Sequence, residues 1–571
     1  MKKYLLQIFT KYKFDLICLL LFCIFPIAAV ITYINNNFLG IISSIFIILF
    51  INLFILWLFR LNIFLKIIAF IFKLIETIFA QLIIKTKGPF DTFYVLDNLD
   101  TVPDIIFSHT VIEVVLFFSL AIFLTFFAYF ISKKIKLALN SRIIILMLLA
   151  LVLVQTTDGR YVFFNRLIFI SPEIPDHLAI GYPLIDRSQE IIFDEDDNIV
   201  LLHLESWNSK VINGDVLIGD ELYQKPMAPV YLDYAKRGLY FSEFYSNSMQ
   251  TIRSQETTLC GITDNLGVRY ADRKENFSFK CLPQIFSENG FKTYFFKAHD
   301  IDFHETRYFM EKIGFDVTAN REIMKENDKE YYWGYQDDIF YQRIFEFLEK
   351  EPTSKKFIYI AVSALVHYPY EMREEFSFLK EFNNPKNAYE EYSNVLKQED
   401  YCLKRFFSYY DKYFPENTHL FIFGDTSMPV GINDNESSHV YAYDDNFLTT
   451  MLYIPPKRNN IEPHVIKERY DQASLFHTIL ELFSENYELD KSIPEITPNN
   501  INDSPRFIRL NQPYTDKWMA LVQYPDKWIY NLKTKTIVYF NLKEDRFEQN
   551  PEIISTSEDL NQFFEYVLTN Q

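Results

Sequence analysis

The first 156 residues are dominated by long apolar stretches separated by short polar connections. A membrane-spanning helix needs roughly 20 apolar residues, and five stretches approach or exceed that length: 14–33, 38–58, 63–84, 105–131 and 143–154 with its flanks. Lys66, Lys73 and Glu76 interrupt the third stretch, and the fifth is short. Because no small-residue cleavage site follows the first stretch, it is not typical of a signal peptide. The pattern predicts a transmembrane domain of five helices over residues 1–156.

Positive charges predict the orientation of these helices. Basic residues precede the first stretch and lie in alternate connections, namely Lys2, Lys3, Lys11, Lys13, Arg60, Lys133, Lys134, Lys136 and Arg142. The connections of opposite parity hold fewer basic residues. Because cytoplasmic connections carry the excess of Lys and Arg, everything after the fifth helix is expected outside a bacterial-type cytoplasmic membrane. The chain is therefore predicted to be a multi-pass membrane protein with a large extracytoplasmic domain.

Beyond the apolar part, the hydrophobic pattern changes to alternating strands and helices. Residues 157–197 contain scattered Pro and Asp and are expected to form a linker. An apolar run from Asn198 to Leu204 suits a buried parallel strand. Further strands are expected at 292–296, 357–362, 420–423 and 450–453, with helices at 338–349, 387–410 and 471–483. This alternation predicts an α/β fold with a mainly parallel sheet.

Composition then excludes one class of partner. The net charge is -18, and the part after the apolar stretches carries most of it. Nucleic-acid binding needs clustered Lys and Arg facing phosphates, and no basic stripe interleaved with aromatic residues occurs in the sequence. We therefore expect no nucleic-acid partner. Phosphate chemistry here would have to rely on a metal ion and a few arginines.

The cysteines bear on the cellular compartment. Cys18 and Cys23 lie in the first apolar stretch, whereas Cys260 and Cys281 lie in the polar part. If that part is exported, the latter two can form a disulfide, which leaves Cys402 free. The alternative is a pair of buried thiols.

Two polar segments near predicted strands carry candidate metal or anion chemistry, at the strand ends where α/β folds place their sites. Glu205 directly follows the first strand, where a carboxylate binds a metal or caps the next helix. Thr251 precedes a segment that could be helical. A hydroxyl near a positive helix N-terminus can bind or attack an anionic group, although a plain N-cap is the commoner role for such a residue taken alone.

Two further segments follow later strands. His367 comes just after the strand at 357–362 and before a proline, where it could protonate a leaving oxygen or bind phosphate, or serve a structural role. Asp425 follows a small residue at the end of the strand at 420–423. This is a common context for a metal ligand and also for a turn.

The order and spacing of these four segments resemble the lipoteichoic acid synthase-like branch of the sulfatase/alkaline-phosphatase superfamily. That branch includes phosphoglycerol and phosphoethanolamine transferases. Glu205 with the following serine resembles its strand-end metal ligand, and Thr251 resembles its threonine nucleophile. His367, followed by Tyr and Pro, resembles a His-x-Pro segment, and Gly-Asp at Asp425 resembles the start of its Gly-Asp-His metal motif.

Other parts of the chain extend this resemblance. The segments around Cys260 and Cys281 are similar to paired cysteine segments of the family, and those around Arg307 and Trp333 are similar to its substrate-side segments. Residues 517–542 resemble the small antiparallel subdomain of sulfatases. The implied organisation is a transmembrane domain (1–156), a linker (157–197), a sulfatase-like catalytic domain (198–497) and a β-rich C-terminal subdomain (498–571).

The sequence departs from the family pattern at Thr426, where the family has a metal-binding histidine. The implied metal ligands are then Glu205, Thr251, Asp425 and Thr426. Such hard oxygen ligands favour Mn²⁺ or Mg²⁺ over Zn²⁺. Whether His299 or His439 supplies a further ligand stays open at this point.

The resemblance implies an enzyme that moves a phospholipid headgroup, phosphoglycerol or phosphoethanolamine, to an envelope glycan or lipid acceptor. Thr251 would attack the phosphorus of the membrane phospholipid donor, diacylglycerol would leave, and an acceptor hydroxyl would displace the phosphothreonine. His367 is the implied group for proton transfer or phosphate binding. Arg253, Arg307 and Trp333 are implied on the substrate side.

Two other functions are weighed against this one. Loss of the histidine at position 426 favours a non-catalytic relative that binds a lipid or a protein partner in the envelope. Joint retention of Glu205, Thr251, His367 and Asp425 favours catalysis. Hydrolysis of sulfate esters is disfavoured, because it requires a Cys or Ser in a Cys/Ser-x-Pro-x-Arg context, which is absent around Thr251.

Overall fold

The computed structural model describes residues 190–484 and 508–554 with short internal gaps, and positions within 52–86 and 119–130. The chain divides into two compact units, residues 1–171 and 172–571. In the first unit, α4 (Ile63–Thr86) begins after Asn62, whose Oδ1 accepts the Leu65 amide at 3.0 Å. Among the described positions, no helix combines the length and the apolar character that crossing a membrane requires. The third predicted span coincides with α4, and the other four lie wholly or partly outside the described residues.

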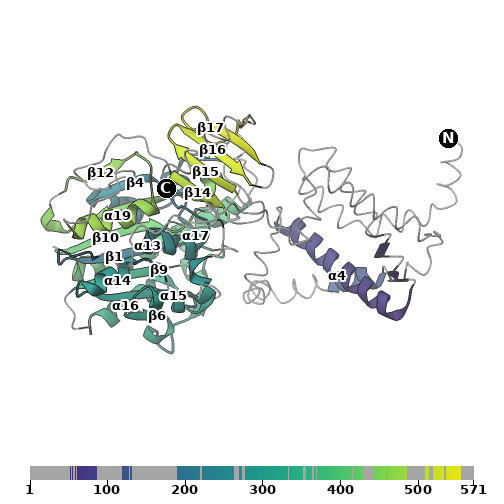
Figure 1. The fold of residues 1–571 in the computed structure, drawn as a ribbon, viewed down its shortest axis with the longest axis horizontal. Helices are drawn as coiled ribbons and strands as arrows, with labels where there is room; N and C mark the ends of the chain where they lie inside the picture. Colours follow the sequence, from purple (N-terminus) through teal and green to yellow (C-terminus); the bar gives the residue numbers. More distant parts are fainter. Residues whose placement is uncertain are drawn as a thin grey trace. The chain divides into compact units, whose positions relative to one another are not determined.

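The second unit is built on one large sheet, drawn at the left of Figure 1. Within the described residues its strand order is β12 (His464–Ile466), β4 (Leu239–Tyr245), β11 (Leu448–Ile454), β10 (Thr418–Gly424), β1 (Asn198–Leu204), β9 (Lys356–Val362), β5 (Lys292–Lys297) and β6 (Val317–Ala319), with β13 (Tyr470–Asp471) paired to β4. The run from β10 to β6 is parallel, whereas β11 is antiparallel to both β10 and β4. The prediction of an α/β fold with a mainly parallel sheet is confirmed.

The sheet is buried on both faces, which explains its apolar strands. In β1, Val200, Leu202 and Leu204 pack into one core, and the alternate residues Ile199 and Leu201 pack into the other. Side chains in a strand point alternately to opposite faces, so a strand covered on both sides has to be apolar throughout. Such runs were therefore visible in the sequence.

Helices cover the two faces. The longer ones include α16 (Asp337–Leu348), α17 (Ala388–Tyr413), α13 (Thr251–Cys260) and α19 (Gln472–Phe483), and shorter ones include α12 (Pro229–Tyr234), α14 (Leu282–Glu288) and α15 (Thr306–Lys312). Residues of α12, α16 and α17 contribute to one core, and residues of α13, α14, α15 and α19 to the other. The helices predicted at 338–349, 387–410 and 471–483 correspond to α16, α17 and α19.

A second, antiparallel sheet follows near the C-terminus (Figure 1). Its strands pair in chain order: β14 (Ile508–Gln512), β15 (Trp518–Gln523), β16 (Asp526–Asn531), β17 (Thr536–Asn541) and β18 (Glu552–Ile554). Lys527 of β16 is fully buried, and its Nζ lies 2.6 Å from carboxylate oxygens of Asp444 and Glu548. Buried charges of opposite sign therefore link this sheet to α18 (Asp444–Phe447). The predicted antiparallel subdomain is confirmed.

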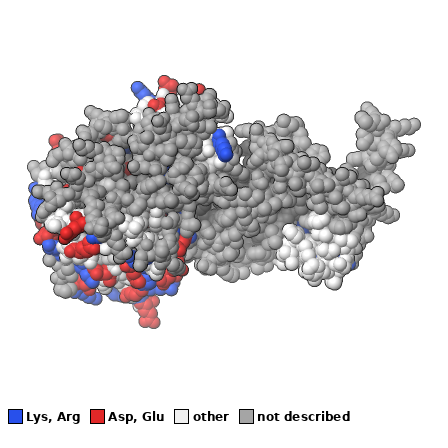
Figure 2. Space-filling model, in the orientation of Figure 1, with Lys and Arg blue, Asp and Glu red and all other residues white. Residues whose placement is uncertain are grey.

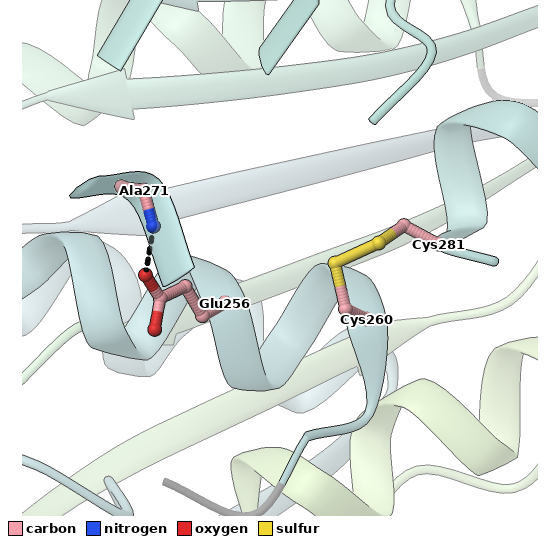
Figure 3. The surroundings of a disulfide bond; sticks show 4 residues. All are labelled: Glu256, Cys260, Ala271 and Cys281. Atoms are coloured by element: carbon pink, nitrogen blue, oxygen red, sulfur yellow. Dashed lines mark hydrogen bonds between the residues drawn. A yellow bond between two sulfur atoms is a disulfide. The ribbon is translucent and has the colours of Figure 1, made fainter. Parts of the chain in front are cut away.

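A disulfide closes the loop between α13 and α14. Cys260 is the last residue of α13, and it is bonded to Cys281, which directly precedes α14 (Figure 3). One turn earlier on α13, Glu256 accepts the Ala271 amide at 2.8 Å, so the same loop is held at a second point. Cys402 is free and buried. The predicted pairing, with Cys402 left over, is confirmed.

Replacing Cys260 and Cys281 together by alanine is expected to lower the free energy of unfolding by about 3 kcal/mol, since the bridge closes a loop between positions 21 apart. Urea denaturation of the full-length protein measures this difference under non-reducing conditions. The difference should vanish when wild type and variant are both unfolded in reductant. A difference that persists in reductant would show that side-chain packing, not the cross-link, causes it.

Candidate active site

The two candidate carboxylates leave neighbouring strands side by side. Leu204, the last residue of β1, pairs with Gly424, the last residue of β10, and the Asp425 amide donates to the Leu204 carbonyl at 2.9 Å. Glu205 and Asp425 therefore follow parallel strands at the same edge of the sheet, as predicted from the sequence. A Cβ at position 424 would lie 1.9 Å from Thr449 Oγ1, which explains the glycine there.

Thr251 lies close to both carboxylates. It is the first residue of α13, and its Oγ1 lies 2.7 Å from Asp425 Oδ2 and 3.2 Å from Glu205 Oε2. Gln250 holds the N-cap position, so the hydroxyl of Thr251 does not serve as a simple cap. The structure thus brings together Glu205, Thr251 and Asp425.

Backbone amides complete the cluster. Asp425 Oδ1 accepts the amides of Ser206, at 2.8 Å, and of Thr426. The Ser206 hydroxyl donates to Glu205 Oε1 at 3.2 Å. Ser206 has a φ of +51°, an uncommon conformation for a residue with a side chain, and this conformation accompanies the turn that directs its amide at Asp425. Strain of this kind is often found at functional sites.

The electrostatics of the pair are unfavourable without a cation. Glu205 is 9 % exposed and Asp425 is fully buried. Burial raises the pKa of both carboxyls, and the neighbouring charge of Asp425 raises the pKa of Glu205 further. Without a cation, burial therefore disfavours the doubly charged form of this pair.

The donor set fits a hard divalent cation. Two carboxylates and the Thr251 hydroxyl converge, and Thr426 follows directly in the chain. Such a cation would remove the repulsion between the buried carboxylates, and oxygen donors are those preferred by Mg²⁺ and Mn²⁺. Within the described part of the chain, no group of three or more His, Cys, Asp or Glu side chains is placed to hold a metal. Among the described residues, the charged donors at this site are Glu205 and Asp425.

The other candidate metal ligands are placed as follows. Thr426 is buried, and its amide is used by Asp425. The ring of His299 lies 5.1 Å from that of Phe303, centroid to centroid, in the segment after β5. His439 lies outside the described residues.

Of the predicted substrate-side residues, Arg253 and Arg307 are described, and each is bonded to side chains of this chain. Arg307 forms ion pairs with Asp302 and Glu322, each at 2.8 Å, so a phosphate would compete with two carboxylates for its guanidinium. Arg253 is buried on α13, and its Nε donates to Gln250 Oε1. Trp333 lies outside the described residues.

His367 lies in a turn beyond β9. Its carbonyl accepts the Tyr370 amide at 2.9 Å, and its side chain is half-buried. Because β9 is the parallel neighbour of β1, this turn is at the same edge of the sheet as Glu205.

The sequence reasoning missed Lys297, the last residue of β5. Its side chain is buried, and its Nζ lies 3.1 Å from Thr306 Oγ1. Burial lowers the pKa of Lys297 to about 8, and the nearby carboxylates of Asp300 and Glu205 oppose that shift. The signal in the sequence was a lysine closing an apolar strand, at the edge where the other candidates gather.

His203 was also missed. It lies in β1, two residues before Glu205, with Nδ1 at 2.8 Å from the Tyr359 hydroxyl and Nε2 at 3.2 Å from Ser254 Oγ. Complete burial lowers the pKa of His203 to about 3, so the ring stays neutral. The ring therefore links β1 to β9 and to α13, one helical turn after Thr251.

The fold is similar to that of known proteins. A family model described as sulfatase matches residues 197–485. The lipoteichoic acid synthase LtaP from Listeria monocytogenes is 16% identical, with 71% of this chain and 95% of that chain covered and a TM-score of 0.52. No curated protein matches the sequence.

Two further solved structures are similar at lower TM-scores. A protein of the alkaline phosphatase superfamily from Vibrio parahaemolyticus is 16% identical over 68% of this chain and 89% of that chain, with a TM-score of 0.49. The C-terminal periplasmic domain of EcEptC from Escherichia coli is 17% identical over 62% and 97%, with a TM-score of 0.43. The family match confirms the predicted resemblance to the sulfatase/alkaline-phosphatase superfamily.

Proposed function

The chain belongs to the sulfatase family, and on that premise we propose that it transfers a phospholipid headgroup, phosphoglycerol or phosphoethanolamine, to an envelope glycan or lipid acceptor. The reaction would pass through a phosphothreonine on Thr251. The observation that carries the proposal is the position of the Thr251 hydroxyl, 2.7 Å from Asp425 Oδ2 and 3.2 Å from Glu205 Oε2. A threonine at the start of a helix, held by two buried carboxylates, is placed to act as a nucleophile rather than as a cap.

The first step makes one P–O bond and breaks another. Thr251 Oγ1 attacks the phosphorus of the donor, and the bond between phosphorus and the diacylglycerol oxygen breaks. The proton of the hydroxyl passes to the Asp425 carboxylate, to which it is already hydrogen-bonded. The leaving diacylglycerol oxygen needs a proton, and His367 is the proposed source. A divalent cation held by Glu205, Thr251, Asp425 and Thr426 would lower the pKa of the hydroxyl and neutralise phosphoryl charge.

The second step reverses these roles. An acceptor hydroxyl attacks the phosphorus of the phosphothreonine, the bond to Thr251 Oγ1 breaks, and Asp425 returns a proton to the threonine oxygen. The proton of the acceptor hydroxyl passes to the base left by the first step, which is His367 in this scheme. Together, the two steps return the protein to its starting state.

Positive charge for the phosphate has to be supplied locally. The chain has a net charge of -18, and acidic and basic side chains of the described residues are interspersed on the face shown in Figure 2. Lys297, buried near Glu205, is placed to supply such a charge. Arg253 and Arg307 are further candidates, with Trp333 on the substrate side.

Activity is expected to fall as the pH rises through about 8, because the buried Lys297 loses its proton there. The charged form is the one that attracts phosphate, so kcat/KM should decrease up to tenfold per pH unit above that value. Lys297→Met should lower kcat/KM and remove this alkaline limb. Lys292→Met is the matched control on the same strand, since Lys292 Nζ lies 3.6 Å from Asp316 Oδ1 and is partly exposed. An alkaline limb unchanged in Lys297→Met would assign it to another group.

We also propose that the second unit acts outside the cytoplasm, anchored by the apolar part of residues 1–156, with the domain boundaries given above. The Cys260–Cys281 bridge supports this location, because disulfides persist in oxidising compartments. The anchor would hold the site beside its membrane phospholipid donor. Labelling of an added cysteine in the second unit by a membrane-impermeant reagent on whole cells tests this location, and protection from the reagent would contradict it.

One observation favours a second function. Thr426 stands where the resemblance to the family implies a metal-binding histidine, and the described residues include no group of three His, Cys, Asp or Glu side chains placed to hold a metal. A non-catalytic relative that binds a lipid or an envelope protein is therefore the alternative. Sulfate-ester hydrolysis is not proposed, because α13 begins with threonine rather than with Cys or Ser.

The direct test is the mass of the Thr251 peptide. The full-length protein is incubated with Mn²⁺ and either phosphatidylglycerol or phosphatidylethanolamine, quenched in acid and digested. The proposed transferase gains one headgroup phosphate on Thr251 with one of the two lipids. An unmodified Thr251 with both lipids, over times long enough for a slow enzyme, favours the non-catalytic function.

A further inference from the structure

The two loops that carry the candidate catalytic groups meet at one short turn. The first loop joins β4 to α13 and ends at Thr251, and the second follows β10 and contains Asp425. These two residues are 174 positions apart in the sequence. Both loops are hydrogen-bonded to residues 471–473, where β13 ends and α19 begins.

Asn247 joins the first loop to this turn. Its Oδ1 accepts the Ala473 amide at 3.1 Å, and its Nδ2 donates to Asp471 Oδ2 at 2.9 Å. The same Nδ2 donates to the Arg509 carbonyl at 3.0 Å, and the Asn247 carbonyl accepts the Asn511 amide at 2.9 Å. Asn247 is 2 % exposed, so these bonds are made away from water. The first loop is thereby fixed both to α19 and to β14 of the second sheet.

Gln472 joins the second loop to the same turn. Its Nε2 donates to the carbonyls of Gly424 and Asp425, at 2.9 and 2.8 Å. These carbonyls belong to the peptide groups on either side of the Asp425 Cα, so their positions set the direction of the carboxylate. Gln472 is fully buried. An amide side chain is required here, because a buried carbonyl that loses its donor costs free energy.

We infer that residues 471–473 form a bracket that sets the distance between the Thr251 hydroxyl and the Asp425 carboxylate, with Asn247 and Gln472 as its positioning residues. The hydrogen bonds of the two side chains go to backbone groups and to Asp471, not to the Thr251 hydroxyl or to the Glu205 and Asp425 carboxylates. Each acts by fixing the backbone from which a reacting or ligating group projects. The effect on catalysis rests on the proposed transferase function, whereas the coupling of the two loops does not.

The physical consequence is that the loops are coupled. Removing the Asn247 side chain frees the first loop and removes two partners from the turn, and removing the Gln472 amide frees the second loop. Because each change also loosens the shared turn, either variant should increase opening of both loops. A hydrogen bond of this kind contributes about 1 kcal/mol, which corresponds to a several-fold change in local opening.

Hydrogen exchange of the full-length protein tests this coupling. The variants are Asn247→Ala and Gln472→Leu, read at peptides covering 246–251 and 424–427. Asn394→Ala is the matched control, since Asn394 also bridges backbone groups, accepting the amides of Glu381 and Phe382 and donating to the Phe382 carbonyl. We expect exchange several-fold faster in both loops for either bracket variant, and faster exchange only around 381–382 for the control.

The second readout separates positioning from general destabilisation. The reaction is measured with the phospholipid that modifies wild-type Thr251. In both bracket variants kcat should be about 100-fold lower with little change in KM, because displacing a reacting group by about 1 Å lowers the rate by that factor. Asn394→Ala should retain kcat. A wild type without any adduct overturns the proposed transferase, and the exchange experiment still decides the bracket.

Exchange confined to the mutated loop in either variant would overturn the bracket, as would wild-type exchange in both loops. If Asn247→Ala does not fold, Gln472→Leu decides the matter, and it is also read in a Thr251→Ala background, which lacks the direct bond from Thr251 Oγ1 to Asp425 Oδ2. Faster exchange in residues 246–251 that persists there supports the bracket, and exchange at the rate of Thr251→Ala alone overturns it.

Discussion

Thr251→Ala is expected to abolish the headgroup adduct and to lower transfer by several orders of magnitude. The substitution removes the atom that forms the bond to phosphorus, and loss of a covalent nucleophile leaves only the contribution of binding and electrostatics. Folding should persist, because among the described residues the hydroxyl is hydrogen-bonded to the Glu205 and Asp425 carboxylates and to no other group. Adduct mass and headgroup release from labelled lipid measure the loss, and thermal unfolding confirms the fold.

Ser254→Ala is the matched control for this prediction. Ser254 lies on the same helix, one turn further on, and its Oγ lies 3.2 Å from His203 Nε2 instead of facing the carboxylates. This variant should still form the adduct on Thr251. Wild-type turnover in Thr251→Ala together with lost turnover in Ser254→Ala would mean that the nucleophile is a different hydroxyl.

Part of this site could be predicted because it depends on neighbouring strands. The apolar runs of β1 and β10 were recognisable, and parallel strands end at the same edge, so Glu205 and Asp425 had to emerge together. Thr251 is different, because its distance from Asp425 depends on bonds made by Asn247 and Gln472. Those side chains carry no local signal of their role.

Other features were hidden for related reasons. The strand β4 was not predicted, since Ser242 and Glu243 interrupt its aromatic residues and its pairing with β11, β12 and β13 stabilises it as a strand. Lys297 was missed because a lysine at a strand end is ordinarily solvated, whereas here it is buried. The local hydrophobic pattern of the sequence predicts which apolar residues are buried, but it does not predict which polar residues the tertiary fold buries.

Thr426→His is expected to tighten Mn²⁺ binding, and removal of a carboxylate is expected to abolish it. An imidazole is a better ligand for Mn²⁺ than a neutral hydroxyl, and position 426 directly follows Asp425. Glu205→Gln and Asp425→Asn should each weaken binding by more than about 100-fold, since loss of even an outer-shell partner costs 10–100-fold. Thr426→Val is the isosteric control, and it should weaken binding only if the hydroxyl is a ligand.

The pH dependence of Mn²⁺ binding provides an independent check. Burial and mutual repulsion raise the pKa of both Glu205 and Asp425, so the metal has to displace protons from this pair. Affinity should therefore increase with pH in wild type and also in Thr426→Val, which keeps both carboxyls. An affinity independent of pH would place the metal elsewhere in the chain.

Calorimetric titration of the full-length protein distinguishes the remaining outcomes. Weak binding in wild type, tighter binding in Thr426→His and loss of binding in Glu205→Gln would support a site that is depleted of ligands but real. Strong wild-type binding that Thr426→His weakens would show that another residue already fills the position, and His299 and His439 would be substituted next. Absence of binding in wild type, even after the histidine is restored at position 426, would favour the non-catalytic relative, because two buried carboxylates and a threonine would then persist without a metal to hold.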